Sequence, residues 1–206
     1  MKNSRGQRQD RDQNSKENQM KTVTIRLLAT LFIAAVTLGF VPAAVAQNKG
    51  KPASVAQVVA LDECDPFSFN LVLGPDFCKN VSIGILGYTT TFQDLFAQAA
   101  AGTPDPGWDF EPDVLNVKQG TTLSVVDQGG EPHTFTEVAK FGGGFIDGLN
   151  AGEATVPECA GGFKNVAVAK TRIIQGSQLQ VTDLSKGEHL FECCIHPWMR
   201  VKVEVK

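Results

Sequence analysis

The chain has 206 residues, of which 42% are hydrophobic and 20% are charged, and its formal net charge is −3. This length and balance allow the packed core of one ordinary domain and exclude a globally disordered chain. Residues 1–46 hold seven of the 19 basic and three of the 22 acidic residues, which leaves 12 basic and 19 acidic residues and a charge near −7. A surface of that sign argues against nucleic acid as a partner.

Residues 1–46 are interpreted as a polar leader followed by a secretory signal peptide. After the polar residues 1–19, Met20 begins a short basic stretch, an apolar run over 27–41 and a small-residue site that ends at Ala46. This is the order of regions in an exported protein. We expect a start at Met20, cleavage after Ala46, and a periplasmic or extracellular protein without a membrane span after cleavage. The alternative is an uncleaved anchor, for which the apolar run is short.

Residues 47–105 are predicted to be an extension that precedes the main domain. Its first part, 47–57, has the composition of a flexible leader. Cys64 and Cys78 are 14 positions apart, and a local disulfide is the natural pairing for them. One short helix is predicted from Thr91, because apolar residues then follow the i, i+3, i+4, i+7 spacing of one helical face: Phe92, Leu95, Phe96 and Ala99.

Residues 106–206 are predicted to form an all-β sandwich. Short runs rich in Val and Thr recur between Gly and Pro turns, at 113–127 with a break at Gln119-Gly120, at 133–139, and in three later segments. In the last segment Val201, Val203 and Val205 alternate with charged residues, as in a half-buried antiparallel strand. The stretch 141–163 is too rich in glycine for regular structure and is predicted to be a long loop insertion.

A Cys-x-x-His-x-x-Met motif follows the penultimate predicted strand, at Cys193, His196 and Met199. Thiolate, imidazole and thioether groups are the ligands of a soft metal, and two histidines, a cysteine and a weak axial methionine form a blue copper site. His133 lies 60 positions before Cys193 at the start of another predicted strand, where it could supply the second imidazole. The sequence therefore predicts that His133, Cys193, His196 and Met199 bind one type 1 copper ion.

Residues 108–206 resemble the cupredoxins, the family of plastocyanin, pseudoazurin and amicyanin. The segment WDFEPDVLNVKQGTTLSVVDQGGEPHTF is similar to the strands before the first histidine ligand, and GEHLFECCIHPWM to the ligand strand and loop, which is compact as in amicyanin. The resemblance implies a Greek-key β-sandwich that carries single electrons between redox partner proteins. We expect a monomer, and a carrier rather than an enzyme, because nothing in the sequence suggests a substrate pocket or a second catalytic metal. The resemblance also implies that His196, flanked by Pro197 and Trp198, is the solvent edge through which electrons leave.

The sequence departs from the family pattern at three places. The 141–163 insertion is longer than in the simplest members, His189 stands where a core aromatic residue is usual, and Asp127 stands where an asparagine often braces the ligand loop. The last two changes could alter the hydrogen bonds around the metal and its potential without removing the site.

Cys193 and Cys194 are adjacent, and strand geometry separates their roles. Neighbouring residues of a strand point to opposite faces, so Cys193 shares a face with Phe191 and Cys194 points away from it. The spacing to His196 and the aromatic residue two positions earlier both select Cys193 as the ligand. Cys194 is then free to pair with Cys159 in the insertion, a hypothesis that leaves one thiolate of the five cysteines for copper.

Other interpretations of these residues remain open from the sequence. A disulfide-bonded strand with a buried methionine would contain the same residues, whereas zinc is disfavoured because thioether sulfur is a poor zinc ligand. A dinuclear copper centre needs two cysteines facing the metal, which adjacent strand residues cannot do. A copper scavenging or storage module, or a cell-surface interaction protein, would keep the same fold. A copper enzyme would need a second metal site and more than the three histidines present.

Overall fold

The computed structural model describes residues 54–79 and 89–206, so the expected signal peptide and its cleavage after Ala46 lie outside the described residues. The strands are β1 (Val55–Leu61), β2 (Asp109–Glu111), β3 (Val114–Val117), β4 (Thr122–Asp127), β5 (His133–Thr134), β6 (Thr136–Val138), β7 (Arg172–Ile173), β8 (Gln178–Val181), β9 (Gly187–Glu192) and β10 (Arg200–Val205). The helices are α2 (Pro66–Leu73), α3 (Phe92–Ala100) and α4 (Val166–Lys170), with 3₁₀ turns at Asp147–Leu149 and Gly162–Lys164. None of the helices in the described ranges has the length and apolar character needed to cross a bilayer.

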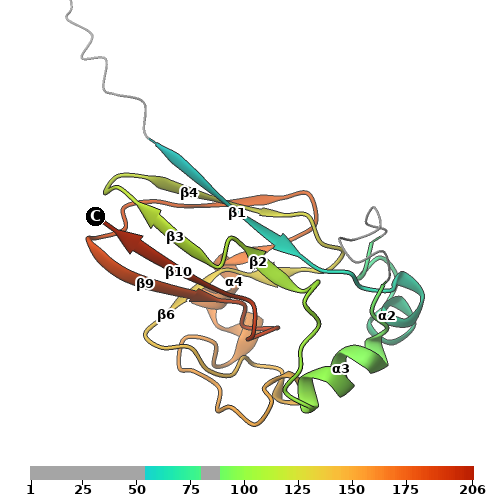
Figure 1. Cartoon of the computed structure of the whole chain (residues 1–206). Coiled ribbons are helices and arrows are strands. Elements are labelled where there is room, and N and C mark those ends of the chain that lie inside the picture. Colours follow the sequence, from blue (N-terminus) through green and yellow to red (C-terminus); the bar gives the residue numbers. More distant parts are fainter. Residues whose placement is uncertain (1–53, 80–88) are drawn as a thin grey trace, which may run out of the picture. The chain divides into compact units, whose positions relative to one another are not determined.

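Two four-stranded sheets pack face to face as a β-sandwich (Figure 1), in the orders β2-β1-β4-β8 and β3-β10-β9-β6. Both sheets are mixed, because β1 runs parallel to β4 and β3 runs parallel to β10 while the remaining pairs are antiparallel. Consecutive strands cross between the sheets at β2–β3, β3–β4 and β8–β9, which is the Greek-key type of connection. One core takes side chains from both sheets, including Val58, Leu123, Phe191 and Val203. The predicted all-β sandwich is confirmed.

Strand β10 shows how the sequence pattern sets the faces of a sheet. Val201, Val203 and Val205 are buried, and Lys202 between them is exposed. The alternation follows because successive side chains of a strand point to opposite faces. β10 is antiparallel to β9, as predicted, but it also pairs in parallel with β3 on its other edge.

Strand β1 corrects the predicted boundary between extension and sandwich. Residues 55–61 lie between β2 and β4, and Val58 and Ala60 are fully buried in the common core. The expectation that 47–57 is a flexible leader is therefore wrong from Val55 onward. The segment VAQVVAL shows no clear alternation of polar and apolar residues, its alanines give a weak strand signal, and the residues before it are polar.

The segment between β1 and β2 contains two helices, whereas the sequence predicted one. α3 begins as predicted, with the Thr91 side chain accepting a hydrogen bond from Asp94 N at 3.2 Å. α2 was missed because its apolar residues do not lie on one face, and Phe67 is 80% exposed. Asp65 caps α2 by accepting from Ser68 N at 2.8 Å. The two helices pack through an edge-to-face contact of Phe69 with Phe92, and Figure 1 shows them together beyond the end of β1.

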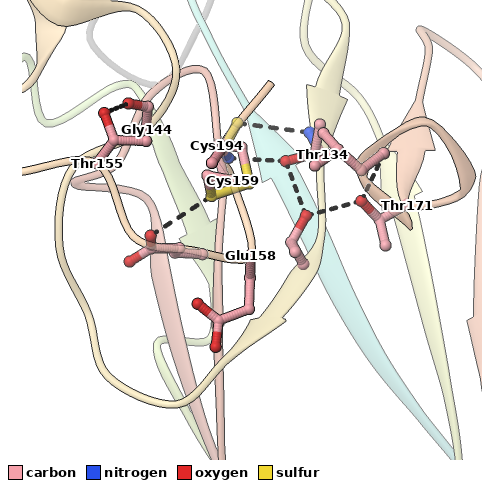
Figure 2. Close-up of a disulfide and its surroundings, with 12 residues drawn as sticks. Thr134, Gly144, Thr155, Glu158, Cys159, Thr171 and Cys194 are labelled. Carbon is pink, nitrogen blue, oxygen red and sulfur yellow. Dashed lines mark hydrogen bonds between the residues drawn. A yellow bond between two sulfur atoms is a disulfide. The ribbon is translucent and has the colours of Figure 1, made fainter. Parts of the chain in front are cut away.

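Both hypothesised disulfides are present, and they attach irregular segments to the sandwich. Cys64 bonds Cys78 across α2, and Cys159 in the insertion bonds Cys194. Figure 2 shows the second bond beside Thr134, whose hydroxyl accepts a hydrogen bond from Cys194 N at 2.7 Å. Residues 141–163 contain turns and no named strand, as the glycine content predicted.

We expect the fragment 106–206 not to fold, because it lacks β1 and so removes the shared partner of β2 and β4. A matched chain beginning at residue 54 retains β1 and is expected to unfold cooperatively in urea. Far-UV circular dichroism across a urea titration measures both. A cooperative transition in the shorter fragment would contradict the role given to β1.

Candidate metal centre

The four predicted ligands come from two places in the sandwich. His133 is the first residue of β5, while Cys193, His196 and Met199 lie in the loop that joins β9 to β10. Antiparallel pairing of the two strands closes the base of this loop. Inside it, Cys193 N donates to Met199 O and Met199 N donates to His196 O, each at 3.0 Å. The loop backbone is therefore held by hydrogen bonds of its own.

Three of these side chains meet in a buried triangle. Cys193 Sγ lies 3.8 Å from His133 Nδ1 and 3.9 Å from His196 Nδ1, and the two nitrogens are 3.4 Å apart. Ligands in a trigonal plane would be about 3.5 Å (N to N) and about 3.7 Å (N to S) apart for bonds of roughly 2.0 and 2.3 Å, as in zinc sites. The triangle therefore has the size of a trigonal His₂Cys metal site.

The surroundings of Cys193 favour the thiolate, which is the form that binds a soft metal. Burial acts to raise the pKa of the Cys193 thiol, but hydrogen bonds and positive charge from His133 and His196 outweigh it and hold the pKa well below its usual value. Backbone N–H groups of Thr134 and His196 also point at the sulfur, at 3.4 and 3.5 Å. The imidazoles and backbone donors together stabilise the thiolate of Cys193.

Met199 is fully buried in the core cluster that also contains Cys193. Its backbone position is fixed by the two hydrogen bonds of the loop. The structure thus brings Met199 into the same core as the triangle, and its role as an axial ligand stays a prediction.

Asp62 holds the outer nitrogen of His133, a contact that sequence reasoning missed. Its Oδ2 lies 2.9 Å from His133 Nε2, and both side chains are fully buried. Burial acts to raise the pKa of Asp62, but the hydrogen bond and charge of His133 and the backbone donors of Gly130 and Glu131 lower it overall. A hydrogen bond at Nε2 leaves Nδ1 to face the sulfur, which is how outer partners orient metal-binding histidines.

Two glycines allow Asp62 to approach this closely. Gly130 N and Glu131 N donate to Asp62 at 2.9 and 3.0 Å. A Cβ on Gly129 would collide with the Asp62 carboxylate, and one on Gly130 would lie 2.5 Å from Cys64 Sγ. The Gly-Gly pair is thus required by a carboxylate and a disulfide on the segment that follows β1.

Glu131 stands at the outer nitrogen of His196 in the same way. Its Oε2 lies 3.3 Å from His196 Nε2, and its Oε1 has no hydrogen-bond partner among the described residues. Burial raises the pKa of the Glu131 carboxyl, and the hydrogen bond to His196 opposes that rise. The pKa of His196 is raised by its hydrogen bonds to Cys193 and Glu131, although burial acts against this.

The expectation of a solvent-exposed His196 edge is wrong. His196 is only 1% exposed, and the ring of Trp108 lies edge-on to it with centroids 4.7 Å apart. Trp198 lies on another side at 5.5 Å and donates from Nε1 to Trp108 O at 3.2 Å. Trp108 belongs to the apolar cluster of α2 and α3, which contains Phe69 and Leu95. Trp108, packed against side chains of α2 and α3, therefore covers the edge of His196 together with Trp198.

The sequence contained weak signals for these contacts. Glu131 is two residues before His133, Asp62 is two residues before Cys64, and Trp108 opens the region that resembles the cupredoxins. No spacing rule relates them to the ligand loop, because the contacts depend on where β1 and the helices pack.

The two unusual positions noted in the sequence lie outside the triangle. Asp127 is buried, accepts from Gly129 N at 3.0 Å, and has its pKa raised to about 7 by burial first and then by the nearby charges of Asp62 and Cys193. His189 bonds Glu137 Oε1 at 2.6 Å and Ser185 O at 2.9 Å. Each therefore has local partners of its own.

A second group of potential ligand atoms shares His133 with the triangle. Asp62, Asp127 and His133 place one atom each within 4.8 Å of one another. Asp62 already accepts hydrogen bonds at both oxygens, from three backbone N–H groups and from His133, so it is not free to bind a second ion.

The adjacent cysteines separate as strand parity predicted. Cys193 belongs to the main core, whereas Cys194 lies in a smaller core with Val138, Val156 and Val168. Cys194 is buried beneath the insertion and bonded to Cys159, and Cys193 is the one free cysteine of the five, all of which are described.

Comparison with known proteins finds no matching family model and no matching curated protein. Among solved structures, the novel purple cupredoxin from Nitrosopumilus maritimus is 13% identical. The match covers 73% of this chain and 99% of the purple cupredoxin, with a TM-score of 0.36. A reduced amicyanin mutant is 22% identical. The match covers 48% of this chain and 73% of the amicyanin, with a TM-score of 0.31. A Cu(I) form of an amicyanin mutant is 21% identical. The match covers 52% of this chain and 89% of the amicyanin, with a TM-score of 0.32. Likeness at these TM-scores carries no inference about a ligand or an activity.

The two faces of the ligand strand can be tested by paired substitutions. Cys159→Ala with Cys194→Ala opens a loop of 35 residues and is expected to lower the free energy of unfolding by about 4 kcal/mol while Cu(I) binding is kept. Cys193→Ala is expected to leave both disulfides intact and to weaken Cu(I) binding strongly. Urea unfolding and copper titration measure the two effects. Copper binding that depends on Cys194 but not on Cys193 would contradict the assignment.

Proposed function

We propose that this chain is an exported type 1 copper protein that carries single electrons between redox partner proteins. The observation that carries the proposal is the buried triangle of Cys193 Sγ and the Nδ1 atoms of His133 and His196, with sides of 3.4 to 3.9 Å. In this proposal these three residues would hold the copper, and Met199 would be a weaker fourth ligand. Bound copper would supply the one-electron redox chemistry.

In this proposal the protein holds the metal ligands in the same positions before and after electron transfer. Cys193 is held by the backbone of Met199 and faces two backbone N–H groups, and each histidine is held at Nε2 by a buried carboxylate. Ligands fixed in this way would change little between Cu(I) and Cu(II), which favours fast electron transfer. The cover formed by Trp108 excludes water from His196.

Burial favours a carrier over a copper storage or scavenging module. Cys193, His133 and Met199 are fully buried and His196 is 1% exposed, so the metal would have no exposed ligand at which to exchange. A module that takes up and releases copper needs such a ligand. An electron carrier keeps its ion through many redox cycles, and for this it needs buried ligands.

The disulfides support export. Both bonds join residues that pack in apolar clusters of the described chain, and such bonds form and persist in oxidising compartments. They agree with the signal peptide that the sequence predicts at residues 20–46.

We expect the Cu(II)-loaded chain to show an intense visible thiolate-to-copper band, with a small parallel hyperfine splitting in its EPR spectrum. Cys193→Ala is expected to lose the band. A carrier should also give reversible voltammetry and exchange electrons between its own oxidised and reduced forms faster than it yields copper to a chelator. Absence of the band, with unchanged copper binding by Cys193→Ala, would refute the proposal, and fast copper loss would favour storage.

Met199→Leu is expected to keep the copper and the thiolate band while raising the reduction potential. A weak axial thioether donor stabilises Cu(II), and leucine removes it without changing the packing volume greatly. Voltammetry and the visible spectrum measure the result. An unchanged potential would show that Met199 is a core residue and not an axial ligand.

A further inference from the structure

Both histidines of the triangle turn their outer nitrogens to a buried carboxylate. His133 Nε2 lies 2.9 Å from Asp62 Oδ2, and His196 Nε2 lies 3.3 Å from Glu131 Oε2. The exposed fractions of the Asp62 and Glu131 residues are 4% and 2%. The two contacts are joined through the backbone, because Glu131 N donates to Asp62 Oδ2 at 3.0 Å.

We propose that Asp62 and Glu131 are a matched pair of positioning residues that hold both imidazoles by Nε2 and lower the reduction potential of the bound copper. The proposal rests on the proposed function, since it concerns the same copper site. It assigns a role to two residues of the segment between β1 and β5 that the ligand motif does not contain.

The physical basis is the choice that a neutral imidazole has between two nitrogens. A carboxylate at Nε2 keeps the proton there, so Nδ1 carries the lone pair that faces the metal. The hydrogen bond also makes the imidazole a stronger donor, and the negative charge lies close to the ion. Both effects stabilise Cu(II) more than Cu(I), because the charge on Cu(II) is larger.

The structure favours a specific role for these carboxylates over incidental burial. A buried carboxylate is costly unless it is paired, and the single hydrogen bond of the Glu131 side chain among the described residues is to His196. Asp62 is held in place by backbone donors of Cys64, Gly130 and Glu131 before it meets His133. The same contact holds the backbone of Glu131, because Glu131 N donates to Asp62 Oδ2, and its carboxylate then meets His196.

Glu131 is the better residue to test, because Asp62 also accepts backbone hydrogen bonds whose loss could unfold the segment. Glu131→Gln keeps an oxygen that can accept from His196 Nε2 but removes the charge. Glu131→Ala removes both. Asp105→Asn is the matched control, because Asp105 is a buried carboxylate whose partners are Thr90 and Gly107 rather than a histidine.

The measurements are the Cu(II)/Cu(I) potential and the exchange of the His196 Nε2–H proton with water, read by NMR in the diamagnetic Cu(I) form. For Glu131→Gln we expect a slowly exchanging Nε2–H and a raised potential, with the ratio of Cu(II) to Cu(I) affinity lowered on the order of tenfold, about 59 mV. For Glu131→Ala we expect the raised potential together with rapid proton exchange. Asp105→Asn should change neither quantity.

Two results would overturn the proposal. One is a potential that stays unchanged in Glu131→Gln and Glu131→Ala while the thiolate-to-copper band is retained. The other is rapid exchange of the His196 Nε2–H proton in the wild-type chain. Either outcome leaves the copper site itself intact, whereas absence of the band in the wild-type chain would refute the proposed function instead.

Discussion

The burial of one thiolate between two imidazoles is the constraint on which the rest of this structure depends. A charged sulfur inside a protein is stable only when donors or cations surround it. Here His133 and His196 hold the pKa of Cys193 well below its usual value in spite of burial. The two rings in turn need partners for their outer nitrogens, and Asp62 and Glu131 provide them. The site is therefore a layered set of polar groups within an apolar core.

Groups that lie outside the ligand loop complete this set. β1 places Asp62 beside His133, the disulfide of Cys64 packs against Gly130, and Trp108 covers His196. The ligand loop alone would leave the histidine edges open. This dependence explains why a segment that resembles an appendage in the sequence contains a central strand of the first sheet.

The sequence predicted those features that local patterns determine. Alternation identified β10, helical spacing and a threonine cap identified α3, and strand parity separated Cys193 from Cys194. It could not predict β1, because alanines and a polar neighbourhood give little strand signal. The covered edge of His196 and the two carboxylates depend on long-range packing, for which one sequence holds no spacing rule. These are the features in which the chain differs most from the site that its ligand motif implies.

The most direct test of the central claim is a crystal structure of the copper-loaded chain with anomalous diffraction measured at the copper edge. We expect one copper peak inside the triangle, bonded to Cys193 Sγ and to the Nδ1 atoms of His133 and His196, with Asp62 and Glu131 on the Nε2 atoms. A copper ion bonded through Nε2, or placed away from Cys193, would contradict the claim.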